Sequence, residues 1–441
     1  MVGLPAGVSC GARGPGGWMR TLFRGGRIFD GTGADAASGD VVVDGNSIVD
    51  VGVGLDGDVA VDCAGNTVLP GLFDCHVHVM FSGNLDYVTQ LNQPFSYQFY
   101  EAVVNLRRTL ATGITTVRDA GGADLGVRQA VEDGLIAGPR MKIAISMLSQ
   151  TGGHFDGWMA CGLDLSSPAH PGMPAGIVDG PHEVRSRVRQ VLRAGADQIK
   201  VATSGGVLSP RSDPRRAQFQ PDEIGEMVAE AAAAGTYVMA HAQSADGIKN
   251  ALRAGARSIE HGVFLDDEAL ELMLQTSAWL VPTLVAPAGV LEAAARGDRM
   301  PDQVLRKSQE EMEAHRASFR RAVAAGVRIA IGTDSGVTPH GRNLRELGLM
   351  AEAGMAPAAV LHATTLSAAR LMRLDERLGS LDKGKLADLV VIDGDPFDFT
   401  ELQNRVSQVW KAGVRVHPSA QATDQSDDAT GLPAGPTVPG P

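Results

Sequence analysis

Residues 193–202 read Arg-Ala-Gly-Ala-Asp-Gln-Ile-Lys-Val-Ala, which is the end of a predicted helix, a glycine and then a short apolar strand. The same joint, a helix that ends in glycine before an apolar run, recurs at Gly113, Gly235, Gly255 and Gly326. A glycine just past a helix can take the left-handed conformation that closes the last turn and redirects the chain. The recurrence of one joint predicts one repeated unit of helix and strand.

Between residues 70 and 376, short apolar runs alternate with stretches that have the spacing of amphipathic helices. Alternating strands and helices are typical of a parallel sheet, and eight such units close into a barrel. The sequence therefore predicts the α/β class, with a (β/α)8 TIM barrel over residues 70–376. The predicted strands are Leu72–Val79, Ile114–Arg118, Met141–Ser146, Gln198–Ala202, Tyr237–Ala240, Ser258–Ile259, Trp279–Leu284 and Arg328–Ile331.

The two ends of the chain have a different pattern. Residues 21–69 and 377–417 contain short strand-like runs between turn residues, which is typical of all-β structure. We expect the two stretches to pair into one small β-sandwich domain beside the barrel. We interpret residues 1–20 as a flexible leader and residues 418–441, rich in Pro, Gly and Asp, as a disordered tail.

The composition excludes several classes of function. The chain has 441 residues, 44% of them hydrophobic, which allows a large buried core. Its formal net charge of −12 is spread along the chain without a basic stripe, so we expect no nucleic-acid partner. The four cysteines have no disulfide or zinc-knuckle spacing, and no apolar run reaches membrane length. We expect a cytoplasmic protein that binds a small molecule and no membrane, and a homo-oligomer is compatible with the sequence.

The chemically informative side chains stand where the predicted strands end. In a parallel barrel these ends lie on one face, where active sites are built. Imidazole and carboxylate groups suit zinc and related divalent ions. Two histidines that end one strand, taken alone, are more often a satisfied core or surface pair, but the agreement of four further strand ends argues for a metal site. The candidate ligands are His76, His78, Lys200, His241, His261 and Asp334.

Lys200 is an unusual candidate because an ammonium group does not bind metals. Burial lowers the pKa of a lysine and favours the neutral amine, which can add carbon dioxide to form a carbamate. The two carbamate oxygens could span two metal ions. The alternative is a lysine at a strand end whose ammonium reaches solvent.

These residues lie in motifs that resemble the amidohydrolase superfamily, and the resemblance covers roughly residues 20 to 417. The motifs are Gly71-Leu-Phe-Asp-Cys-His76-Val-His78, Gln198-Ile-Lys200, Ala240-His241-Ala, Ile259-Glu-His261-Gly, Ile331-Gly-Thr-Asp334 and Gly379-Ser-Leu-Asp-Lys-Gly-Lys-Leu-Ala-Asp388-Leu-Val-Val.

Within that superfamily, two stretches are similar to the imidazolonepropionase-related group, which includes Xaa-Pro and Xaa-Arg dipeptidases and N-acyl amino acid hydrolases. They are Ser149-Gln-Thr-Gly-Gly-His154 and Lys200-Val-Ala-Thr-Ser-Gly-Gly-Val-Leu-Ser-Pro210. The resemblance implies two divalent metal ions, with zinc as the expected ion. It assigns His76, His78 and Asp334 to the first ion, His241 and His261 to the second, and carboxylated Lys200 to the bridge between them.

One position departs from the pattern of that group. Members often carry a tyrosine two residues after the histidine that ends the fifth strand, where this chain has Gln243. The departure concerns substrate specificity rather than the metal site.

The expected chemistry is hydrolysis of an amide bond. Asp334 would take a proton from the attacking water and pass it to the leaving amine. His154, in a long loop over the mouth of the barrel, would bind the substrate carbonyl or the oxyanion, or else only pack its loop. Gln243 is a further substrate candidate, and Arg211 and Arg215 could pair with a substrate carboxylate, although an exposed loop face is the simpler interpretation of these arginines.

Three functions follow as hypotheses. The first is hydrolysis of a dipeptide or N-acyl amino acid with a free carboxylate. The second is a cyclic-amide hydrolase of the imidazolonepropionase kind. The third is a catalytically inactive barrel that acts as a binding protein, which the loss of one or more metal positions would favour.

Overall fold

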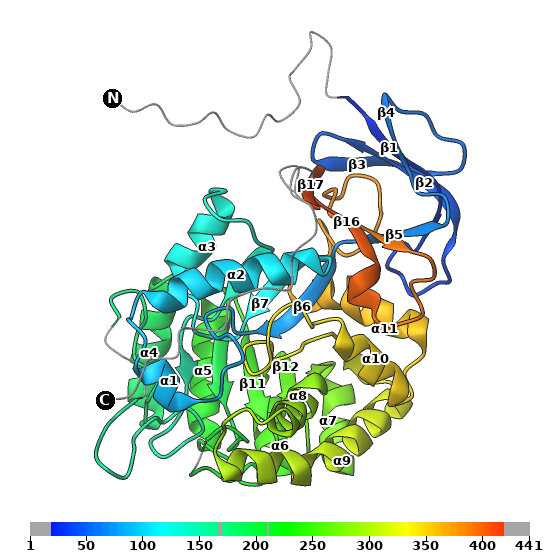
Figure 1. Cartoon of the computed structure of the whole chain (residues 1–441). Coiled ribbons are helices and arrows are strands. Elements are labelled where there is room, and N and C mark those ends of the chain that lie inside the picture. Colours follow the sequence, from blue (N-terminus) through cyan, green and yellow to red (C-terminus); the bar gives the residue numbers. More distant parts are fainter. Residues whose placement is uncertain (1–18, 166–169, 210, 419–441) are drawn as a thin grey trace, which may run out of the picture.

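The computed structural model describes residues 19–165, 170–209 and 211–418. Apart from residues 19, 20 and 418, the expected leader and tail lie outside the described residues. The chain forms an α/β structure in which parallel strands are surrounded by helices, with a separate β-rich part at one side (Figure 1). No described helix is both long and apolar enough to cross a membrane.

Parallel strands form two sheets, with the orders β14-β13-β12-β11-β10-β9 and β6-β7-β8. Consecutive strands are neighbours in both sheets, as expected for repeated βα units. The strands are β6 (Leu72–Val77), β7 (Ile114–Asp119), β8 (Arg140–Ile143), β9 (Met147–Leu148), β10 (Ile199–Ala202), β11 (Val238–Ala242), β12 (Ser258–His261), β13 (Trp279–Val281) and β14 (Arg328–Ile329).

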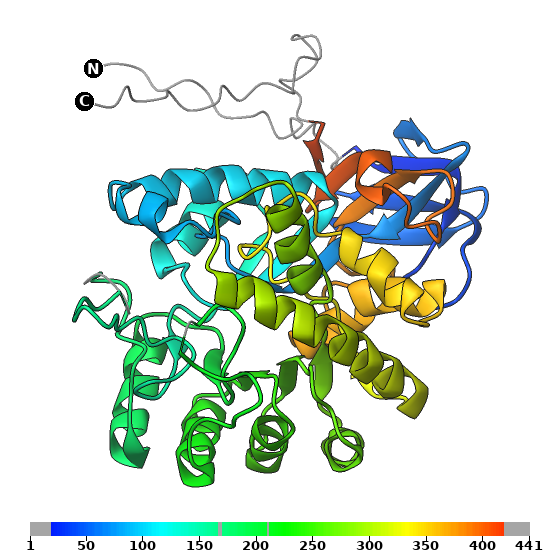
Figure 2. The same cartoon turned by 60° about the horizontal axis from the view of Figure 1, so that its bottom comes forward.

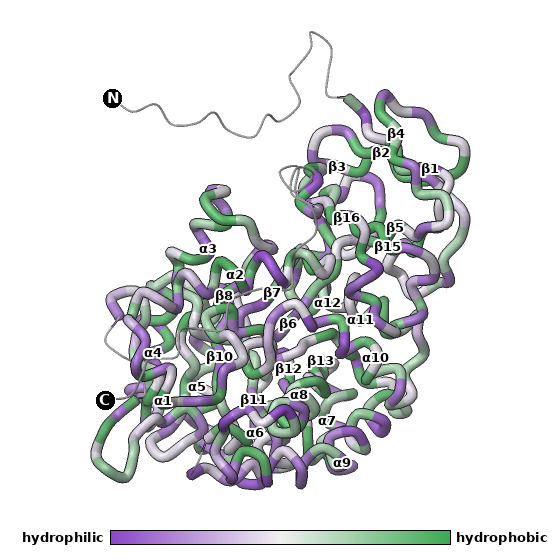
Figure 3. Tube along the Cα trace, viewed as in Figure 1, coloured by the Kyte–Doolittle hydropathy of each residue, from purple (hydrophilic) through white to green (hydrophobic). Residues whose placement is uncertain are grey.

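Helices follow these strands and cover their outer side (Figure 2). Hydrophilic and hydrophobic residues alternate along the tube of the outer helices, as expected for helices with one buried face (Figure 3). They are α1 (Tyr87–Leu91), α2 (Tyr97–Ala111), α3 (Leu125–Glu132), α4 (Gly180–Arg193), α5 (Pro221–Ala233), α6 (Ala245–Ala254), α7 (Asp267–Thr276), α8 (Val285–Ala295), α9 (Asp302–Ala325), α10 (Arg345–Glu352), α11 (Pro357–Thr364) and α12 (Leu366–Leu371).

The predicted glycine joints are present. Gly255 ends α6 with φ +98° and Gly326 ends α9 with φ +79°, both in the left-handed conformation. The glycines at the three other joints also have positive φ. A residue with a Cβ atom would be strained there, which explains why the same residue recurs before these strands.

The chain links the two parallel sheets at two places. The expected strand Met141–Ser146 is observed only as far as Ile143, in β8, which pairs with β7. Ile145 then has φ +63°, and the chain continues into β9, which lies beyond the expected strand and pairs with β10. At the other edge, the chain after β14 runs along β6. Asp334 N donates to the carbonyl of His76 at 2.8 Å, and His78 N donates to the carbonyl of Ser335 at 2.7 Å.

The two chain ends meet in one sheet of eight strands, with the order β17-β16-β15-β5-β1-β2-β3 and β4 beside β1. Its strands enclose a core that includes Phe23, Val41, Ile48 and Val391. Antiparallel pairing of β5 with β15 connects the ends (blue and orange-red in Figure 1). The strands are β1 (Thr21–Ile28), β2 (Ala37–Asp44), β3 (Ser47–Gly52), β4 (Val59–Asp62), β5 (Asn66–Pro70), β15 (Leu389–Asp393), β16 (Val406–Lys411) and β17 (Val414–His417).

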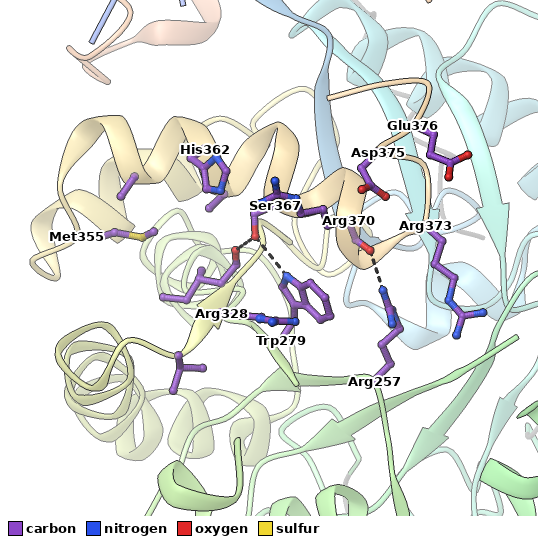
Figure 4. A pocket seen from close by; sticks show the side chains of 14 residues that line it. Arg257, Trp279, Arg328, Met355, His362, Ser367, Arg370, Arg373, Asp375 and Glu376 are labelled. Carbon is purple, nitrogen blue, oxygen red and sulfur yellow. Dashed lines mark hydrogen bonds between the residues drawn. The ribbon is translucent and has the colours of Figure 1, made fainter. Parts of the chain in front are cut away.

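A cavity of about 790 Å³ borders the N-terminal ends of β12, β13 and β14 (Figure 4). Arginine and aromatic side chains stack there in an alternating ladder. Trp279 lies between Arg257 and Arg328, whose guanidinium carbons are 4.7 and 5.0 Å from its ring centroid. Tyr237 lies in the same way between Arg257 and Arg373, at 5.4 and 5.3 Å. We call this stack the arginine ladder.

Candidate metal centre

The carboxyl ends of the parallel strands bring three predicted ligands together. His76 lies on β6, His78 directly follows that strand, and Asp334 follows β14. One ligand atom from each lies within 4.8 Å of the other two. The Oδ1 atom of Asp334 is 3.4 Å from Nε2 of His76 and 3.3 Å from Nε2 of His78. Two imidazole nitrogens and a carboxylate oxygen at this spacing are a suitable donor set for a divalent ion.

The other two predicted histidines lie beside this group. The ring centroid of His261, at the end of β12, is 5.1 Å from that of His76. The centroid of His241, on β11, is 4.6 Å from that of His261. His241 Nε2 donates to the carbonyl of Gly205 at 3.0 Å, which leaves its Nδ1 lone pair for another partner.

Lys200 on β10 points into the same cluster. Its side chain is buried, and Nζ is 3.2 Å from Nε2 of His76. Burial lowers the pKa of Lys200 to about 8, because the charged ammonium loses its hydration. A substantial fraction of the amine is therefore neutral near physiological pH.

Burial also keeps most of the imidazoles neutral. It lowers the pKa of His241 to about 4 and the pKa values of His76 and His261 well below the ordinary range. Neutral imidazole is the form that binds metals. In contrast, the pKa of Asp334 is lowered even though burial opposes this, because His76, His78 and Lys200 surround the carboxylate.

Each ring of the His76–His78–His261 group is oriented by a second partner. His76 Nδ1 donates to Glu260 Oε2 at 2.8 Å, and His78 Nδ1 donates to the carbonyl of Gly121 at 2.8 Å. His261 Nδ1 lies 2.7 Å from the hydroxyl oxygen of Thr283. These contacts leave the Nε2 atoms facing the cluster, which is the usual arrangement around metal-binding histidines.

Glu260 is itself held by a buried cation. Arg118 on β7 donates from Nη2 to Glu260 Oε1 at 2.9 Å and from Nε to the carbonyl of Cys75 at 2.7 Å. Both side chains are fully buried. The charge of the glutamate is therefore neutralised while its second oxygen remains directed at His76.

The segment around Asp334 is held in an unusual conformation. Asp334 has φ +56° and His261 has φ +72°, values that are rare for residues with a Cβ atom. Buried Asp74 accepts hydrogen bonds from the Thr333 hydroxyl at 2.6 Å and from the Asn343 amide at 2.8 Å, next to Asp334. Such strain persists only where the surroundings impose it, and it is common at functional sites.

His154 and Gln243 also lie at this end of the strands. The ring of His154 stacks on that of His241, with centroids 4.3 Å apart and planes 21° apart. Gln243 is buried two residues after His241. His154 Nδ1 and Gln243 Oε1 are both buried atoms without a hydrogen-bond partner. Unsatisfied buried polar atoms are rare in folded proteins and need an explanation.

The two predicted carboxylate-binding arginines lie further out. Arg211 stacks over the Trp158 ring, with its guanidinium carbon 4.4 Å from the centroid. Arg215 stacks over Phe264 at 5.0 Å and is 3.4 Å from Glu310. Both side chains are exposed. The structure therefore brings the six predicted ligands and His154 together. Gln243 follows β11 closely, and the two arginines lie on the exposed loop after β10.

Several supporting residues were missed by sequence reasoning. His315 Nε2 donates to the carbonyl of His261 at 3.0 Å, and His340 Nε2 donates to the carbonyl of His78 at 3.2 Å. Asp119 accepts a hydrogen bond from Val79 N at 2.8 Å. Asp119 had a usable signal, because it follows a predicted strand, whereas the two histidines are on or before helices without informative spacing.

Comparison with known proteins agrees with this geometry. Residues 67–416 match the amidohydrolase family. The chain is 34% identical over 366 residues to the ochratoxinase of Aspergillus niger, covering 78% of this chain and 75% of that one. It is 27% identical over 354 residues to the imidazolonepropionase of Bdellovibrio bacteriovorus, covering 76% and 75%. A solved structure of a Xaa-Pro dipeptidase with methionine bound in its active site superimposes with a TM-score of 0.82 at 34% identity, covering 90% and 99%.

Proposed function

The chain belongs to the amidohydrolase family and is a hydrolase of carbon–nitrogen bonds, and from this premise we propose that it cleaves a dipeptide or N-acyl amino acid with a free carboxylate. The observation that carries the proposal is the meeting of His76, His78 and Asp334, with Lys200, His241 and His261 around them. We also propose that the two joined parallel sheets form a closed (β/α)8 barrel over residues 70–376, with the sheet of both chain ends as a β-sandwich domain.

We propose that the centre holds two divalent ions, with zinc as the expected metal. The donor set fits, because neutral imidazoles and an ionised carboxylate are available together. His76, His78 and Asp334 would hold one ion, and His241 and His261 the other, with Lys200 as a carbamate between them. Bound divalent ions supply Lewis-acid activation of water and of the scissile carbonyl.

Asp334 is the proposed proton carrier. Its carboxylate stays ionised because its pKa is held low, and its side chain is 14% exposed, so a substrate can approach it. In that position it would accept a proton from the attacking water and return it to the leaving nitrogen.

His154 and Gln243 are the proposed substrate contacts. Burial holds the pKa of His154 well below the ordinary range, so the ring is neutral and one nitrogen carries a proton. That N–H would stabilise the oxyanion that develops on the scissile carbonyl. The Gln243 amide would contact the same substrate from the end of β11. Arg211 or Arg215 would pair with the substrate carboxylate.

A relative with a ligand bound in its active site supports the choice of substrate. One solved relative is a Xaa-Pro dipeptidase with bound methionine, and a second relative is an ochratoxinase. An amino acid in the active site of the dipeptidase suggests that a carboxylate is also recognised here.

A substrate panel tests this proposal. Zinc-loaded protein should release amino acids from dipeptides and N-acyl amino acids, with kcat/KM at least about tenfold lower when the carboxylate is capped as an amide, because a charge-assisted hydrogen bond is lost. Replacing both Arg211 and Arg215 with Ala should remove that preference, and Arg193→Ala, on the exposed end of α4, should not. Equal turnover of capped and free substrates would refute carboxylate recognition.

A cyclic-amide hydrolase is the second candidate, favoured by the similarity to an imidazolonepropionase. Turnover of imidazolones without turnover of any dipeptide or N-acyl amino acid would establish it in place of the first. If the protein turns over none of these substrates and binds no metal, the remaining hypothesis is the catalytically inactive barrel that acts as a binding protein.

A further inference from the structure

The inner face of helix α9 carries polar groups without partners. Glu311 is 2% exposed and Ser308 is fully buried. Neither Oε1 of Glu311 nor Oγ of Ser308 has a hydrogen-bond partner. A buried carboxyl group with an unsatisfied oxygen is costly, and its presence in a folded protein calls for a ligand or a function.

The neighbours of Glu311 on α9 place it near the loop after β10 and the end of β12. One turn earlier, Lys307 Nζ donates to three carbonyls of the loop after β10. One turn later, His315 Nε2 donates to the carbonyl of His261 at 3.0 Å. Residues four apart lie on the same helix face. Glu311 therefore faces the space between the loop after β10 and the end of β12.

The opposite wall of that space belongs to the candidate site. The carbonyl of Gly205 accepts the hydrogen bond from His241. A Cβ atom on Gly206 would lie 2.3 Å from the ring of His154, so this ring rests on the main chain of the same loop. Gln243 N donates to Ser204 Oγ at 2.8 Å, and Gln243 Oε1 has no partner.

The neighbouring Lys307 has no N–H donor left for Glu311. Lys307 has three N–H donors, and the carbonyls of Gly206, Ser209 and Ser212 take all three. Burial raises the pKa of Glu311 to about 8, although Lys307 and Arg215 oppose the shift, so the carboxyl group without a ligand is mostly protonated at neutral pH. A cation bound beside it would favour the ionised form. The unpartnered oxygens of Glu311 and Gln243 are hydrogen-bond acceptors. They complement a group that is rich in donors and positively charged.

We propose that Glu311, assisted by Gln243, binds a cationic nitrogen of the substrate. This inference rests on the proposed peptidase-like function and narrows its substrate class. The cationic nitrogen could be the α-ammonium group of a dipeptide or the side chain of an arginine or lysine residue. An ionised carboxylate that binds a cation in a dry site forms a strong charge-assisted hydrogen bond.

Turnover by Glu311→Gln in the zinc-loaded full chain tests the proposal. The panel comprises Ala-Leu, N-acetyl-Leu, Ala-Arg and N-acetyl-Arg. If the α-ammonium group is the ligand, kcat/KM falls at least about tenfold for both dipeptides and stays within about twofold for both N-acetyl substrates. If the side chain is the ligand, the loss follows arginine instead. Equal loss on all four substrates, or no loss on any, overturns the proposal.

The matched control is Glu313→Gln, the same change on the exposed face of α9, which should leave all four values unchanged. Glu311→Met provides a second variant, because an apolar residue in place of an unsatisfied carboxyl should not lower the free energy of unfolding. It should still show the same selective loss of activity.

Titration calorimetry on the same proteins separates this inference from the proposed function. The probes are L-argininamide, which carries both cationic groups, and the uncharged N-acetyl-leucinamide. If the wild type hydrolyses none of the panel, the proposed function fails, but binding of L-argininamide that Glu311→Gln weakens at least about tenfold still supports the subsite. Binding of L-argininamide that Glu311→Gln leaves unchanged overturns it.

Discussion

The two ends of the parallel strands both carry buried or half-buried charges, but the charges are used differently. At the N-terminal ends, Arg257 donates from Nε to the carbonyl of Leu371 at 2.8 Å and from Nη2 to the carbonyl of Arg370 at 2.7 Å. Its guanidinium group also stacks on Tyr237 and Trp279. At the carboxyl ends, His154, Gln243 and Glu311 each keep a buried atom without a partner.

The difference separates a structural charge cluster from a site prepared for a ligand. In the described part of the chain, no arginine of the ladder lies within 4.0 Å of a carboxylate. Backbone carbonyls accept hydrogen bonds from these guanidinium groups, and aromatic rings stack on them. The size of the cavity beside them (Figure 4) is therefore a poor guide to function. Unsatisfied acceptors and neutral histidines are the better guide.

The largest effect should come from the catalytic end. Asp334→Asn should lower kcat by about 10²- to 10⁴-fold, because the amide cannot carry a proton between water and the leaving nitrogen. Steady-state kinetics measure the loss, and metal analysis verifies that metal content is largely retained. Asp375→Asn, the same change beside the arginine ladder, should retain full activity. A similar loss in both variants would erase the distinction between the two ends.

A smaller effect is expected one contact away from the metal. Glu260→Gln should weaken zinc binding by about 10- to 100-fold, because His76 loses the carboxylate that orients its ring. Competition with a chelator of known affinity measures the change, and circular dichroism verifies the fold. The matched control is Glu376→Gln, the same substitution beside the cavity at the N-terminal ends of the strands. Unaltered zinc affinity in Glu260→Gln would show that the contact does not support the metal site.

The arginine ladder should affect stability alone. Arg257→Ala should lower the free energy of unfolding by about 2 kcal/mol, because two hydrogen bonds and two ring contacts are lost. Urea denaturation measures the change, with Arg193→Ala as an exposed control near zero. The kcat/KM of the folded variant should match the wild type. Lost activity without lost stability would assign the ladder a role in catalysis.

The smallest effect concerns the reactivity of Lys200. Its pKa of about 8 means that the neutral amine rises roughly fivefold between pH 7 and pH 8. At a fixed concentration of dissolved carbon dioxide, metal-free protein should recover activity with added zinc roughly fivefold faster at pH 8 than at pH 7. Lys200→Met should recover none at either pH. A recovery rate that is independent of pH would argue against carbamate formation.

Much of the architecture and of the candidate metal centre was predictable from local sequence. Strand period and the glycine joints located the parallel strands, and the positive φ of Gly255 and Gly326 confirms the joints. His76 and His78 could be assigned to one side because alternate residues of a strand share a face. The early end of the third strand at Ile143 was not predictable, because nothing in the sequence suggests that Ile145 has a left-handed backbone.

The sequence alone determined which side chains reach the carboxyl ends of the strands, since the period of a strand is a local property. The tertiary structure decided what those side chains meet: Glu260 contacts His76 across 184 residues, and the packing of α9 places Lys307 against the loop after β10. Such contacts depend on the relative positions of whole elements, which side-chain spacing within one element does not encode.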